Sequence, residues 1–126
     1  MRFTHTFILL VLLVSGCHRR DAKLDQQIVG TWTNEGHWSM SFSSDGSFSS
    51  GPPSLLYQGT WFTKDGELVS TITNATGTKK HEPVGSIDRL RIVRVDAGKL
   101  ALSSQLAFIE DGQTNYRPVT NYFDRR

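Results

Sequence analysis

The sequence contains a single cysteine, Cys17, and no strong excess of charge of either sign. One cysteine cannot form a disulfide within the chain, which excludes a disulfide-stapled fold. Lysine and arginine number 14 against 12 aspartates and glutamates, and the two signs are interspersed along the chain. A nucleic-acid-binding domain is expected to carry clustered basic residues. The composition therefore argues against nucleic acid as a partner.

Long hydrophobic runs are also scarce, and the one unbroken block is Phe7–Val14. A helix needs about 20 apolar residues to cross a bilayer. The block is much shorter, follows Arg2 and His5, and is followed by the small residues Ser15 and Gly16. Length, preceding charge and following small residues are typical of a secretory signal peptide. We therefore expect residues 1–16 to be a signal peptide and not a membrane-spanning helix.

The end of this segment, Val14-Ser15-Gly16-Cys17, resembles the lipobox of bacterial lipoproteins. The resemblance implies cleavage before Cys17 and attachment of acyl chains to its sulfur and new amino group. Two or more acyl chains give stable anchoring, at about 0.8 kcal/mol per buried CH₂ group. The expected location is the cell envelope, and His18 in place of Asp implies the outer membrane, facing the periplasm, in a two-membrane cell. The alternative is a plain secretory signal with a free Cys17.

Residues 17–27 would then comprise the lipidated cysteine and a polar tether, which spans at most ~3.5 Å per residue. Arg19, Arg20 and Lys23 could contact anionic headgroups, each contributing about 1 kcal/mol near an acidic surface. Asp21 and Asp25 offset these charges, so a solvated linker is the favoured interpretation.

The rest of the chain, from residue 28, shows turn signals at short intervals and no helical period. Glycine beside Asp or Asn supplies the positive φ that tight hairpins require. Regular turns between short apolar segments predict an all-β fold, here an antiparallel up-and-down barrel of about eight strands, with a sandwich as the alternative. The turn signals lie at 34–36, 44–46, 51–53, 64–66, 74–77, 96–98 and 111–112.

Between the turns, apolar and polar residues alternate with the period of a strand. Two interruptions predict irregularities: Gly59 between Tyr57 and Trp61 indicates a bulge or bend, and a broken alternation near Ile92-Val93 indicates a second bulge. The barrel domain is expected to cover residues 28–119, with a last strand over 113–119. Residues 120–126 are predicted to be a polar tail.

Gly30-Thr31-Trp32 resembles the opening of the lipocalin and calycin barrels. With the 42–48 hairpin (Phe-x-x-Asp-Gly-x-Phe) and the second Gly-Thr-Trp at 59–61, the span 28–117 is similar to short lipocalin-like domains of bacterial lipoproteins. The resemblance implies that Trp32 closes one end of the barrel under an arginine of the last strand. Arg117 is the residue expected there, in a structural cation–π pair of about 0.5–2 kcal/mol.

Catalytic and metal-binding motifs are not evident. There is no Gly-x-Ser-x-Gly elbow and no glycine-rich phosphate loop. Glu35 and His37 lie far in the sequence from His81 and Glu82, without the usual spacing of metal ligands. We therefore expect a protein that is not an enzyme and has no metal or cofactor.

The aromatic residues of the strands are the remaining functional signal. Trp38, Phe42, Tyr57 and Trp61 could line the mouth of a barrel and bind a small apolar ligand. The alternative is that they form the core of a filled barrel. Such a barrel would be a structural lipoprotein that presents a surface to another envelope protein, for example the strand with Arg89, Arg91 and Arg94.

Overall fold

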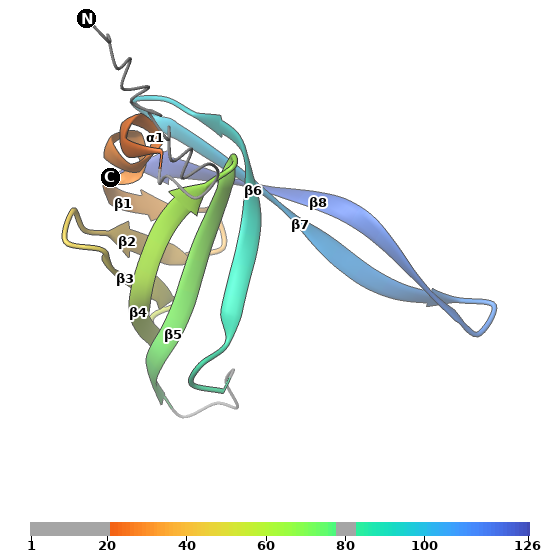
Figure 1. Ribbon diagram of the computed structural model, residues 1–126. Helices are drawn as coiled ribbons and strands as arrows, with labels where there is room; N and C mark the ends of the chain where they lie inside the picture. The colour runs from red at the N-terminus through yellow and green to blue at the C-terminus, as the bar shows by residue number, and fades with distance from the viewer. Residues whose placement is uncertain (1–20, 78–82) are drawn as a thin grey trace, which may run out of the picture.

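The computed structural model describes residues 21–77 and 83–126, so the predicted signal peptide and Cys17 lie outside the described residues. Over these two ranges the chain forms one short helix and eight antiparallel strands, which close into a barrel in sequence order (Figure 1). This arrangement confirms the predicted all-β, up-and-down barrel. The elements are α1 (Ala22–Ile28), β1 (Gly30–Thr33), β2 (Ser39–Phe42), β3 (Ser47–Gly51), β4 (Leu55–Lys64), β5 (Glu67–Gly77), β6 (Ile87–Val95), β7 (Lys99–Glu110) and β8 (Gln113–Arg125).

Two of the tight turns have the backbone that their Asp-Gly sequences predict. Asp65 and Gly66, between β4 and β5, have φ angles of 51° and 76°. Asp111 and Gly112, between β7 and β8, have 51° and 74°. Left-handed φ at both central residues matches the twist of the flanking strands, as in type I′ hairpins. The turn chemistry therefore sets the positions of these hairpins locally.

Both predicted bulges are confirmed. The β4–β5 register shifts between Gln58 and Gly59, and the β6–β7 register shifts between Ile92 and Arg94. A Cβ atom at Gly59 would lie 1.8 Å from the carbonyl oxygen of Thr71. Glycine is therefore required at this position because of the close backbone approach.

The barrel interior is packed with large apolar side chains around three interacting aromatic rings. The ring of Phe42 stacks with that of Phe48 at a centroid distance of 6.2 Å and meets the edge of Trp61 at 5.3 Å. Such pairs contribute about 0.5–1.5 kcal/mol beyond their buried area. The buried cluster also contains Ile28, Trp32, Met40, Leu55, Tyr57, Leu68, Ile72, Leu100, Leu102 and Phe123.

The structure differs from the prediction at the N-terminal boundary of the domain. Residues 22–27, predicted as tether, form α1 together with Ile28, and the Asp21 side chain caps this helix by accepting from Leu24 N at 3.1 Å. Leu24 and Ile28 are one helical turn apart, and both pack against the core. Burial of these two residues explains why a mostly polar segment is helical here.

The C-terminal boundary is also corrected. Strand β8 does not end at Val119 but continues to Arg125, and Phe123 is buried. Trp32 and Thr33 of β1 pair with Arg125 and Asp124, so the predicted polar tail supplies the pairing that closes the barrel.

β7 and β8 pair with each other along their full length, but the neighbouring strands β6 and β1 pair with them over only a short part of it. β6 pairs with β7 only over residues 100–103, and β1 pairs with β8 only at 124–125. Residues 104–119 therefore leave the barrel as a two-stranded hairpin, here called the arm, which projects to the right in Figure 1.

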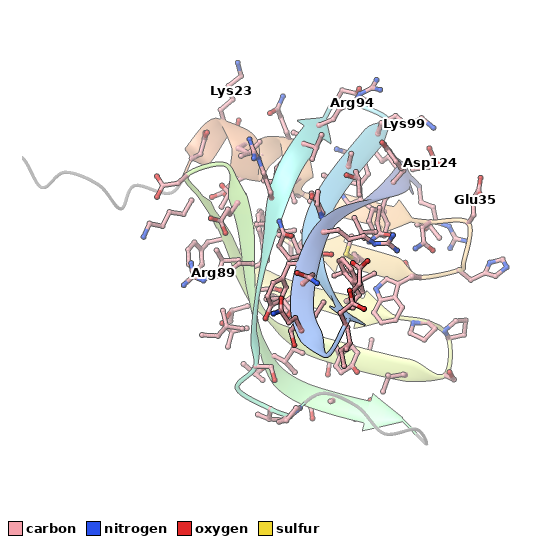
Figure 2. All side chains as sticks on the ribbon, turned by 90° about the vertical axis from the view of Figure 1, so that its right-hand side faces the viewer. Lys23, Glu35, Arg89, Arg94, Lys99 and Asp124 are labelled. Carbon is pink, nitrogen blue, oxygen red and sulfur yellow. The ribbon has the colours of Figure 1, made fainter. Side chains whose placement is uncertain are left out.

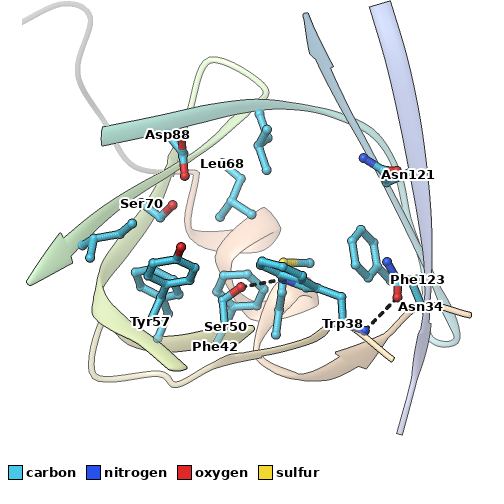
Figure 3. Close-up of a pocket in the computed structure, with 14 residues that line it drawn as sticks. Asn34, Trp38, Phe42, Ser50, Tyr57, Leu68, Ser70, Asp88, Asn121 and Phe123 are labelled. Carbon is cyan, nitrogen blue, oxygen red and sulfur yellow. Dashed lines mark hydrogen bonds between the residues drawn. The ribbon is translucent and has the colours of Figure 1, made fainter. Parts of the chain in front are cut away.

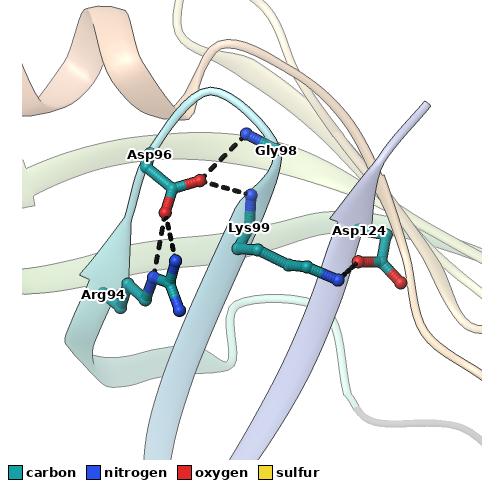
Figure 4. Close-up of polar contacts among 5 residues, drawn as sticks. All are labelled: Arg94, Asp96, Gly98, Lys99 and Asp124. Carbon is teal, nitrogen blue, oxygen red and sulfur yellow. Dashed lines mark hydrogen bonds and ion pairs between the residues drawn. The ribbon is translucent and has the colours of Figure 1, made fainter.

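Polar contacts at the β6–β7 turn fix the start of β7 and the end of β8 within the barrel (Figure 4). The Asp96 carboxylate accepts from Gly98 N at 2.9 Å, Arg94 Nε at 2.9 Å and Lys99 N at 2.8 Å. These donors, the Gly98 amide first, lower the pKa of Asp96 below its usual value. Lys99 also forms an ion pair with Asp124 of β8.

Candidate functional site

One end of the barrel is closed by α1, Trp32 and Arg125. The Trp32 side chain is fully buried, and its Nε1 donates to the carbonyl oxygen of Ile28 at 2.8 Å. The guanidinium of Arg125 lies over the indole, 4.2 Å from the ring centroid. It also donates to three backbone carbonyl oxygens, those of Gln27, Val29 and Ala97, each at 2.8 Å. Arg125 therefore joins α1, β1 and the β6–β7 turn.

The expectation that Arg117 packs over Trp32 is wrong. Arg117 lies in the arm, opposite Leu106, and is exposed. Arg125 takes the expected place because β8 returns to β1 only at its C-terminal end. An arginine from the last strand does contact Trp32, but it is a different residue from the expected one because this strand continues to Arg125.

A buried hydroxyl attaches the helix to the barrel wall. Thr63 of β4 is fully buried, and its Oγ1 donates to the carboxylate of Asp25 in α1 at 2.5 Å. The backbone N–H of Thr63 donates to the same carboxylate oxygen at 3.0 Å. Because a buried polar group without a partner is costly, these bonds fix how α1 lies against β4.

A cavity of about 350 Å³ lies within the barrel (Figure 3). Its lining is mostly apolar and aromatic, with a minority of polar side chains. The apolar lining residues are Trp38, Met40, Phe42, Phe48, Tyr57, Leu68, Ile72, Leu90 and Phe123, and the polar ones are Asn34, Ser50, Ser70, Asp88 and Asn121.

Trp38 and Tyr57 form an aromatic wall of this cavity. Their ring centroids are 6.4 Å apart with an interplanar angle of 29°. The indole Nε1 of Trp38 donates to Ser50 Oγ at 2.8 Å, and its backbone N–H donates to Asn34 Oδ1 at 2.9 Å (Figure 3). The first bond orients the Trp38 ring, and the second holds its backbone at the wall of the cavity.

The polar lining side chains come from separate strands and loops. Ser70 of β5 and Asp88 of β6 are directly opposite each other in the sheet register. Asn34 follows β1, and Asn121 belongs to β8. Among the described residues that line the cavity, Asp88 is the one carboxylate, and it is an acceptor for a donor or cationic group of a ligand.

Three of the four predicted ligand-binding residues, Trp38, Phe42 and Tyr57, line the cavity. The fourth, Trp61, does not belong to its lining. Its side chain is 3% exposed, and Nε1 donates to the carbonyl oxygen of Ser43 at 2.9 Å. Trp61 packs edge-on against Phe42 and therefore supports the cavity wall from behind.

Sequence reasoning missed the residues that reach the cavity from β6 and β8. Asp88 and Leu90 are two residues apart, which places them on one face of β6 and is a detectable signal. Asn121 and Phe123 have the same spacing, but they fall within residues 120–126, which the sequence predicts as a polar tail. Register across the sheet brings both pairs to the cavity.

A comparison with protein-family models, curated proteins and solved structures found no match to this chain. Within residues 21–77 and 83–126, no group of three or more His, Cys, Asp or Glu side chains could hold a metal ion. His81 and Glu82 lie outside the described residues. In the same two ranges, no helix has the length and apolar character needed to cross a membrane.

Proposed function

We propose that this chain is a lipid-anchored, lipocalin-like binding protein of the cell envelope that holds a small, mainly apolar ligand in its barrel. The observation that carries the proposal is the cavity of about 350 Å³. Ligand sites commonly measure about 300–1,000 Å³ and combine an apolar lining with a few placed polar groups. The cavity is at the lower end of this range, so the ligand is small.

The lining favours a ring-containing ligand with one polar end. Trp38 and Tyr57 present aromatic faces, which pack well against another ring. Ser70 and Asp88 lie together on adjacent strands and can accept from a hydroxyl, amine or amide donor. An apolar body against the aromatic wall and a donor toward Asp88 would satisfy both parts of the site.

Replacing Trp38 with alanine is expected to weaken binding of the neutral fluorescent probe N-phenyl-1-naphthylamine about 10-fold, equivalent to about 1.4 kcal/mol. Loss of one ring from the wall removes stacking worth about 0.5–1.5 kcal/mol together with apolar contact area. The affinity is measured by fluorescence titration. Because Trp38 is only partly buried, its replacement should lower the free energy of unfolding less than replacement of a fully buried aromatic residue would.

The matched control is Tyr122→Ala, which removes an aromatic side chain that is 71% exposed and absent from the cavity lining. Its probe affinity should equal that of the wild type. Failure of the wild type to bind the probe, or equal losses in both variants, would reject the cavity as the binding site. If the probe binds in the cavity, native mass spectrometry of the full chain can detect the natural ligand as an added mass that is lost on denaturation.

The anchor is tested separately through Cys17, which lies outside the described residues. Cys17→Ala removes the acylation site, so the protein should move from the membrane fraction to the soluble fraction when cells are lysed and centrifuged. His18→Ala, at the neighbouring position, should leave the distribution unchanged. Retention of the Cys17→Ala chain in the membrane fraction would contradict lipid anchoring at this residue.

The second candidate function is a structural lipoprotein that associates with another envelope protein. The observation that favours association is the exposure of Arg89, Arg91 and Arg94 on β6. Charge reversal at Arg89, Arg91 and Arg94 followed by co-purification tests the basic strand for this role. Unchanged partners would exclude that surface.

A further inference from the structure

The arm exposes apolar side chains on both of its faces. Leu106 and Phe108 share one face and are 46% and 37% exposed, while Ile109 and Tyr116 share the other and are 80% and 67% exposed. A hairpin of two strands is at best marginally stable in water without a third strand or a packing partner. The arm therefore has the composition of a surface that another chain covers.

The two outer edges of the arm differ in their capacity to pair. Arg125 N donates to Gly98 O on the β7 side, and Arg126 N donates to Thr31 O on the β1 side. In an antiparallel ladder the backbone N–H and C=O groups of successive residues point alternately to the two sides of the strand. The β7–β8 register runs without a shift to the turn, so this alternation continues along the whole arm. Even-numbered residues of β8 therefore point their backbone polar groups to its outer edge.

Pro118 falls at one of these outward positions, so the outer edge of β8 lacks a donor there. Proline at an edge strand impedes pairing with a further strand. By the same alternation, Gln105, Ala107 and Ile109 point their N–H and C=O groups to the outer edge of β7. β6 covers that edge only as far as Ser103, so beyond it the β7 edge is available to another strand.

We propose that two copies of this chain associate by antiparallel pairing of their β7 edges, with Ala107 of one copy opposite Ala107 of the other. This register places Leu106 opposite Phe108 of the second copy, on one face of a four-stranded sheet. It also places Glu110 opposite Ser104, so no like charges face each other directly across the new pairing. Apolar contacts of an aromatic ring across paired strands stabilise antiparallel sheets, and like charges directly opposite each other would destabilise them.

Charge at the ends of the new sheet favours the same arrangement. The register places Glu110 opposite Ser104 of the other copy, so the acidic tip of each arm, Glu110-Asp111, ends beside the point where β6 of the other copy stops pairing with β7. Ser103 pairs with Arg91 at the point where β7 leaves β6, and Arg89 is nearby on the same strand. Both arginines are exposed, and Figure 2 shows Arg89 directed away from the barrel. Arg94 is instead paired with Asp96, with Nη2 2.7 Å from Oδ2.

The shape of the molecule is compatible with this pairing. The arm projects well clear of the barrel (Figure 1), so antiparallel arms leave the two barrels at opposite ends of the shared sheet. An interaction of the arm with lipid is less well supported, because its tip carries two adjacent carboxylates, Glu110 and Asp111. A second copy supplies both the strand edge and the opposite charge.

Cysteine cross-linking tests the register. Ala107→Cys is introduced into the full chain, which is purified in a nonionic detergent and mildly oxidised. Directly opposed hydrogen-bonded residues have Cα atoms about 5.5 Å apart, within the usual range of a disulfide. We expect a disulfide-linked dimer on a non-reducing gel. Thr114→Cys, on the outer edge of β8, should remain monomeric on the gel, and the unsubstituted chain reports any contribution of Cys17.

Proline substitution tests the edge itself. Ala107→Pro removes a donor that faces outward and leaves the β7–β8 ladder intact, so it should shift the protein mass measured by light scattering from two chains to one. Thr114→Pro makes the matched change on the β8 edge and should leave the mass at two chains. Circular dichroism shows whether both variants retain the barrel.

A single-chain mass for the unsubstituted protein would overturn the proposal. So would equal loss of the dimer in the Ala107→Pro and Thr114→Pro variants, because the association would then not depend on the β7 edge. Linkage of the Ala107→Cys chain to a different protein, with no homodimer, would assign the arm to another partner. These outcomes are independent of probe binding in the cavity.

Discussion

Replacing Arg125 with alanine is expected to lower the free energy of unfolding by about 3 kcal/mol. The change removes donors to three carbonyl oxygens and the cation above Trp32. A hydrogen bond from a charged donor contributes about 1.5–3 kcal/mol, and exposure of two of these bonds reduces that figure. The cation–π contact adds about 0.5–2 kcal/mol. Urea unfolding followed by tryptophan fluorescence measures the difference.

Arg117→Ala is the matched control, because it removes the same side chain from an exposed position in the arm. Its effect should stay within about 0.5 kcal/mol, as is usual for surface substitutions. Equal losses of stability in the two variants would contradict the assignment of barrel closure to Arg125. A lysine at position 125 would keep the charge but not the fork of donors, so it should recover only part of the loss.

Replacing Gly59 with alanine is expected to destabilise the barrel by about 3 kcal/mol, the upper end of typical overpacking effects. The new Cβ would lie 1.8 Å from the carbonyl oxygen of Thr71 and 2.8 Å from Cε1 of Phe48. The first neighbour is backbone, so β4 and β5 must separate at the bulge to accommodate the methyl group. The midpoint of urea unfolding reports the cost.

Gly98→Ala provides the control for this substitution. A Cβ at Gly98 meets no atom within 4 Å and lies on backbone without a positive φ. Its stability should remain close to that of the wild type. An unchanged stability of the Gly59→Ala variant would contradict the close approach between β4 and β5 at this bulge.

Alternation and turn chemistry were sufficient to predict the architecture. Asp65-Gly66 and Asp111-Gly112 adopt the left-handed turns expected of them, and both irregular positions in the alternation became register shifts. Three of the four aromatic residues predicted to bind a ligand line the cavity for the same reason: side chains two residues apart share a face of a strand.

The closing arginine and the ends of the domain were not predictable in this way. Arg117 and Arg125 both lie on β8, and only the pairing of β8 with β1 determines that Arg125 is the residue that covers Trp32. The helix at 22–28 depends on burial of Leu24 and Ile28 against a barrel built from later residues. Each of these features rests on contacts between distant segments, which local pattern does not contain.

The sequence by itself determined the strand order, the tight turns, the two bulges and the inward face of most strands, because each depends on neighbouring residues through backbone sterics and a period of two. The tertiary structure alone decided which arginine covers Trp32, that Asp88 and Asn121 reach the cavity, and that β7 and β8 extend beyond the barrel. These depend on the register with which the sheet closes on itself. Closure is a single condition on the whole chain, and a shift in one strand would change the partners of all the others.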